Sequence, residues 1–115
     1  MARDFQVRSA ERDDKTDQDR LRSVSRTIES AISSVRKEKE TLRTRVDTAR
    51  DLASFSAGTE YDEYLTRDTT DTARITEYER QMLAGEKRID ELERQLGGLE
   101  QIQELFVRLF SNSLR

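Results

Sequence analysis

A repeat of apolar side chains at alternating steps of three and four residues is the feature that most constrains this chain. Such spacing places its members on one narrow stripe of an α-helix, and helices pack together along stripes of this kind in coiled coils. The repeat therefore predicts a long first helix that begins near Leu21. Its members are Ile28, Ile32, Val35, Leu42, Val46, Ala49 and Ala53, with Lys39 filling the one gap.

A second stripe with the same spacing follows later in the chain. Between the two stripes, Gly58 can follow a helix end and Thr59 can cap the start of the next helix, so residues 56–60 are predicted to form a turn. The sequence thus predicts an all-α fold, a long antiparallel two-helix coiled-coil hairpin over residues 21–98. The second stripe consists of Ile75, Tyr78, Met82, Gly85, Ile89, Leu92, Leu96 and Leu99.

A hairpin also requires that facing residues have numbers that add to a constant. A turn near Gly58 predicts a sum of about 117. With this sum the stripe positions from Leu21 to Leu42 face stripe positions, whereas nearer the turn Val46 faces Asp71 and Ala49 faces Asp68. Gly85 would then make room for Ile32, and Lys39 would extend across Tyr78. The packed section is predicted to comprise the pairs Leu21–Leu96, Ile28–Ile89, Ile32–Gly85, Val35–Met82, Lys39–Tyr78 and Leu42–Ile75.

In this register the N-terminal and C-terminal segments of the chain do not place apolar residues opposite each other. Residues 1–20 are highly charged and are interpreted as a solvated arm or a frayed helix start, whereas residues 99–115 form a short amphipathic helix and tail after Gly97-Gly98. Phe106 would face Glu11, which leaves the most apolar segment without an apolar partner. We therefore predict a docking surface for a protein partner or a second copy, with fold-back as a third short helix as the alternative. The candidate residues are Leu99, Ile102, Leu105, Phe106, Leu109 and Phe110.

The predicted hairpin tip is a second candidate site. Four large apolar or aromatic residues gather around the turn, where they either cover the end of the packed stripe or contact a partner. These residues are Phe55, Tyr61, Tyr64 and Leu65.

Composition argues against several classes of function. Charged residues make up 39% of the chain and hydrophobic residues 33%, and there is no Cys, His or Trp. We therefore expect no enzymatic activity, no cofactor and no metal site. A net charge of −3 with both signs interspersed argues against nucleic-acid binding. Membrane binding is disfavoured because the terminal segment lacks a basic bias, and a cytoplasmic location is expected.

These observations favour a non-enzymatic adaptor or structural subunit of a larger, bacterial assembly that docks or self-associates through residues 99–110. Two alternatives remain. One is an accessory chaperone or stalk protein of a bacterial secretion or export ATPase, since the general shape is similar to that of flagellar export coiled-coil subunits, although no motif carries that likeness further. The other is a peripheral membrane scaffold that uses the terminal helix as a foot.

Overall fold

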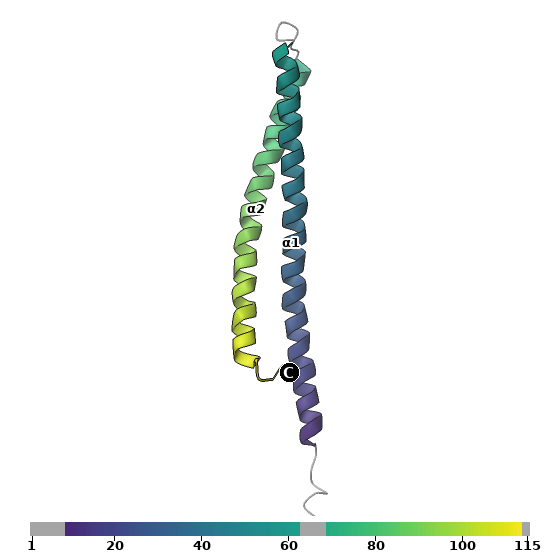
Figure 1. Ribbon diagram of the computed structural model, residues 1–115, viewed down its shortest axis with the longest axis vertical. Coiled ribbons are helices and arrows are strands. Elements are labelled where there is room, and N and C mark those ends of the chain that lie inside the picture. The colour runs from purple at the N-terminus through teal and green to yellow at the C-terminus, as the bar shows by residue number, and fades with distance from the viewer. Residues whose placement is uncertain (1–8, 63–68, 114–115) are drawn as a thin grey trace, which may run out of the picture. The chain divides into compact units, whose positions relative to one another are not determined.

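The computed structural model describes residues 9–62 and 69–113, with side chains for residues 9–56 and 72–113. Within these ranges the chain forms two helices, α1 (Ala10–Asp62) and α2 (Thr69–Phe110), which run antiparallel (Figure 1). The predicted all-α helical hairpin is therefore confirmed. The two helices contribute to two compact units, a middle unit formed by Ser34–Leu96 and an end unit formed by Met1–Ser33 and Gly97–Arg115.

Helix α1 begins earlier than the apolar repeat indicates. The Ser9 side-chain oxygen accepts a hydrogen bond from the Arg12 backbone N–H at 3.1 Å, which is the geometry of an N-cap. Glu11 and Asp13 lie in the first turn, where negative charge stabilises a helix start. Residues 10–20, interpreted from sequence as an arm or a frayed start, therefore belong to a capped helix, and residues 1–8 lie outside the described range.

The predicted turn at residues 56–60 is wrong, because these residues are helical. Helix α1 continues to Asp62, and α2 starts at Thr69. The packed stripe of α1 extends through Ala53 to Ser56, both half-buried, so continued packing favours a longer helix. A single glycine in a helix costs only about 1 kcal/mol relative to alanine, which is too little for Gly58 to end a helix that tertiary contacts hold.

Burial in the middle unit follows the predicted repeat. Each stripe position of α1 and α2 is buried or half-buried, and the residues between them are exposed. Val46 and Leu92 are the most completely buried large side chains, at 2% and 1% exposure. This narrow core explains why a chain with so few apolar residues folds as a helical pair. Among the side chains of this unit that the structure describes, the buried residues are Val35, Val46, Ala49, Gly85, Ile89 and Leu92.

The register of the hairpin differs from the predicted one. Val46 lies against Gly85, so facing residue numbers add to 131 rather than 117. The difference is 14 residues, which is two complete heptads. When one helix is shifted along the other by whole heptads, stripe positions face stripe positions again. The pairing of stripe positions in the sequence therefore could not distinguish the register of 117 from the register of 131.

Size matching distinguishes the observed register from the predicted one. A sum of 131 places Ala49 opposite Met82 and Ala53 opposite Tyr78, so small residues of α1 face large residues of α2. The predicted register instead placed Val46 opposite Asp71. Complementary volumes fill a helical interface without voids, whereas a carboxylate opposite valine would lose hydration or leave a gap.

Gly85 allows close approach of the two helices, but at Val46 rather than at Ile32 as predicted. A Cβ atom added to Gly85 would lie 2.5 Å from Cγ2 of Val46. Valine in a helix has one strongly preferred rotamer, so its methyl group cannot easily move away. The glycine is therefore required by packing within the hairpin.

Lys39 occupies a stripe position, but its predicted contact with Tyr78 is not the one observed. In the 131 register Lys39 faces Leu92, and its Nζ lies 3.8 Å from a carboxylate oxygen of Glu93. Its side chain is 33% exposed, which leaves the ammonium in contact with water while the stem covers the core.

Replacing Lys39 with leucine should stabilise the hairpin. The substitution buries more apolar surface at a core position and loses one partly exposed ion pair, which is worth about 0–1 kcal/mol. We expect the free energy of unfolding to rise by about 1 kcal/mol, measured by urea denaturation followed by circular dichroism. Lys37→Leu, at an exposed position of the same helix, is the control and should change stability by less than about 0.5 kcal/mol. A loss of stability in Lys39→Leu would contradict this account.

Candidate docking surface

The predicted docking residues divide into two groups that face different ways. Leu99, Phe106 and Phe110 continue the packed stripe of α2 and are buried or half-buried, with Phe106 only 8% exposed. The rest of the set remains at the surface, on another side of the same helix. These exposed residues are Ile102 at 53%, Leu105 at 46% and Leu109 at 64%.

A docking surface was predicted because the terminal apolar segment had no apolar partner within the hairpin. For Leu99, Phe106 and Phe110 this reason is wrong. The 131 register places Phe106 opposite Ser25, not Glu11, and Phe110 opposite Leu21. Phe110 and Leu21 line one shallow groove of the end unit. The rings of Phe106 and Phe110 also pack on each other, with centroids 5.2 Å apart. The end unit therefore has its own short core.

Helix α2 does not break at Gly97-Gly98, so residues 99–110 are its last part rather than a separate short helix. Two glycines weaken the helix by about 2 kcal/mol relative to alanine, but Leu96 and Leu99 on either side lie on the packed stripe and hold it. The alternative in which residues 99–110 fold back as a third helix is excluded by this continuity.

The exposed group forms a second stripe on α2, which we call the outer stripe. It consists of Gly98, Ile102, Leu105 and Leu109, at steps of four, three and four residues. This spacing is that of a helix-packing stripe, and it lies beside the first stripe on the helix surface. Three large apolar residues about half exposed on one side of one helix are therefore arranged as a second packing surface.

Val24 of α1, 44% exposed, extends this surface across the end unit. Val24 and Ile102 each immediately precede a residue of the packed stripe, Ser25 and Gln103. In an antiparallel pair such positions lie on the same side, as Glu38 and Arg88 do in the middle unit, where they form a hydrogen-bonded ion pair. Sequence reasoning missed Val24, although an apolar residue off the stripe in a polar segment was a usable signal.

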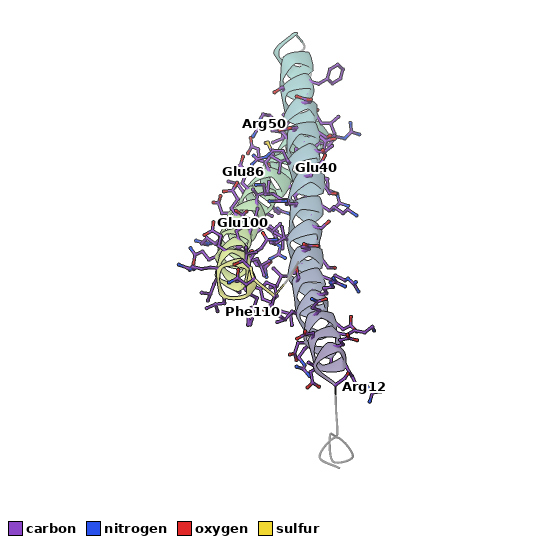
Figure 2. The ribbon with its side chains drawn as sticks, turned by 60° about the horizontal axis from the view of Figure 1, so that its bottom comes forward. Arg12, Glu40, Arg50, Glu86, Glu100 and Phe110 are labelled. Carbon is purple, nitrogen blue, oxygen red and sulfur yellow. The ribbon has the colours of Figure 1, made fainter. Side chains whose placement is uncertain are left out.

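One corresponding pair of positions in the middle unit holds an ion pair instead of apolar residues, although Leu52 and Phe55, 43% and 74% exposed, also each precede a residue of the packed stripe. Arg88 donates to both carboxylate oxygens of Glu38, at 2.9 and 3.3 Å. On the other side, Arg50 donates to Glu86 at 3.2 Å (Figure 2). The hydrogen bonds and charge of Glu38 raise the pKa of Arg88, which stays cationic. These ion pairs are about half exposed, so each contributes little to the stability of the helical pair.

The predicted tip site is described only at Phe55. Its side chain is 74% exposed and lies off the packed stripe, so it does not cover the end of the core. The side chains of Tyr61, Tyr64 and Leu65 lie outside the described residues. No cluster of described residues that could hold a metal ion exists, and no described helix is long and apolar enough to cross a membrane.

Comparison with known proteins gives no match. No family model matches the chain, and neither a curated protein nor a solved structure matches it.

Proposed function

We propose that this chain is a non-enzymatic interaction protein, a helical-hairpin subunit of a larger assembly that docks through the outer face of its end unit. We define the outer face as Val24 together with Ile102, Leu105 and Leu109. The observation that carries the proposal is the exposure of these four large apolar residues, between 44% and 64%, on one side of one unit.

At one pair of equivalent positions the two units differ in a way that supports this assignment. Where the middle unit pairs Glu38 with Arg88, the equivalent positions of the end unit hold Val24 and Ile102. Charged pairs at flanking positions keep a helical pair soluble, whereas apolar residues there extend the packing stripe to accept another helix. A helix with its own apolar stripe is the partner that this face fits.

Site-specific photo-cross-linking tests the proposal whatever the identity of the partner. A benzophenone amino acid at position 105 in the full chain, expressed in the native host, should give one discrete adduct of higher mass. The same probe at Leu83, which is 69% exposed on the middle unit, should give none, because no second apolar stripe surrounds it. Leu109→Asp should abolish the adduct from position 105 by placing an unpaired charge in the interface.

Absence of an adduct from position 105, or equal adducts from positions 105 and 83, would mean that the outer face engages nothing. Circular dichroism of Leu109→Asp controls for misfolding, because residue 109 is 64% exposed and its substitution should leave helix content unchanged.

A further inference from the structure

We propose that the outer stripe docks on the same stripe of a second copy of this chain, with the two α2 helices antiparallel across a two-fold axis. This inference rests on the proposed function and adds the partner and the register. The outer stripe is Gly98, Ile102, Leu105 and Leu109, so its spacing of four, three and four residues is the same in both directions. An antiparallel copy can therefore match it position for position.

The matched register is one in which facing residue numbers add to 207. Ile102 then faces Leu105 of the second copy, and Leu109 faces its Gly98, each pairing occurring twice by symmetry. Large side chains meet in the centre and a large side chain meets glycine at each end. This is the same size matching by which Val46 meets Gly85 inside the hairpin.

Gly98 supplies an independent observation for this register. Glycine is the poorest helix former after proline, and Gly98 lies in the interior of α2. Unlike Gly85, neither Gly98 nor Gly97 is required by packing among the described residues, because a Cβ added at either would meet no atom beyond its own stretch of helix within 4 Å. A leucine from a second copy seated over Gly98 gives this glycine a packing role. Nothing in the structure explains Gly97, which lies off the stripe.

The charges around the outer stripe are compatible with self-pairing. On the side of the stripe that carries Gln101 and Arg108, Gln101 would lie closest to Arg108 of the second copy, because their numbers add to 209, whereas two copies of Gln101 add only to 202. The amide oxygen of glutamine can accept a hydrogen bond from a guanidinium group, so this contact brings no like charges together. Such a dimer would join four helical segments around a shared core, which is the arrangement of a four-helix bundle.

Light scattering on the purified full chain tests the dimer. We expect a particle of twice the 13.4 kDa chain mass. Gly98→Leu should raise the dimer dissociation constant about a hundredfold, because it fills the space that Leu109 of the other copy occupies. Gly97→Leu is the matched control, since it makes the same change one residue away from the stripe, and it should leave the dissociation constant unchanged.

A compensating swap makes the register itself testable. In the double variant Gly98→Leu with Leu109→Gly, each new leucine meets a new glycine of the other copy, so dimerisation should recover at least about tenfold over Gly98→Leu alone. Circular dichroism should show helix in every variant. Equal weakening by Gly98→Leu and Gly97→Leu, or no recovery in the swap, would overturn the register.

The failure of this inference can be told apart from the failure of the proposed function. A purified chain that stays monomeric at about 100 micromolar, combined with a discrete adduct to another protein from position 105, would overturn the dimer and leave the docking role intact. A monomer that co-sediments with anionic liposomes would overturn the dimer in favour of a membrane contact. A dimer that survives Leu109→Asp would place the interface elsewhere and also overturn it.

Discussion

Leu92→Ala should lower the free energy of unfolding by about 3 kcal/mol, the expected cost when a buried leucine is cut back and leaves a cavity. Leu92 is 1% exposed, the most buried large side chain among the described residues. It faces Lys39, whose stem covers it from α1. In a two-helix core there is no third layer that can move in to fill the space, so relaxation recovers little of the loss.

Leu83→Ala is the matched control for this measurement. It makes the same substitution in the same helix and the same unit, at a side chain that is 69% exposed. Its effect should stay within about 0.5 kcal/mol. Urea denaturation at one fixed protein concentration measures both, because self-association would add a concentration-dependent contribution to stability. Equal effects of the two substitutions would mean that Leu92 is not in the core.

The sequence was sufficient to predict which residues pack. The structure buries or half-buries the stripe positions from Ile28 to Ala53 and from Ile75 to Leu99. Residues spaced alternately three and four apart lie on one side of a helix, so the spacing alone identifies the packed side. Local signals were less informative. Gly58 and the pair Gly97-Gly98 were interpreted as a turn and a break, yet all three lie within helices, since tertiary packing outweighs the propensity of single residues.

The register could not be obtained from periodicity alone. A heptad stripe matches another after every shift of seven residues, so only features that break the repeat distinguish one register from the next. Gly85 is such a feature, and it was assigned to Ile32 instead of Val46. The predicted docking set inherited this error. Phe106 was taken as unopposed, and Val24 was overlooked, because the wrong register placed charged residues beside the terminal segment.

Cysteine pairs should distinguish the two registers directly, since the chain has no cysteine of its own. Glu38→Cys with Arg88→Cys replaces a pair whose side chains lie within hydrogen-bonding distance, at 2.9 Å, and are both 47% exposed to reagent. Cysteine is shorter than either of these side chains, so this double variant should cross-link nearly completely with a short bis-maleimide, whose spacer restores the lost length. The product is an internally linked chain that migrates faster on a denaturing gel.

Glu38→Cys with Arg74→Cys is the pair that the predicted register would bring together, because residue 74 lies two heptads before residue 88 on the same side of α2. Fourteen residues of helix span about 21 Å, which exceeds the reach of a disulfide or a short cross-linker. We therefore expect an initial cross-linking rate at least about tenfold lower for this pair. Faster linkage at position 74 than at position 88 would restore the register of 117, and with it the interpretation that Phe106 lacks a partner in the hairpin.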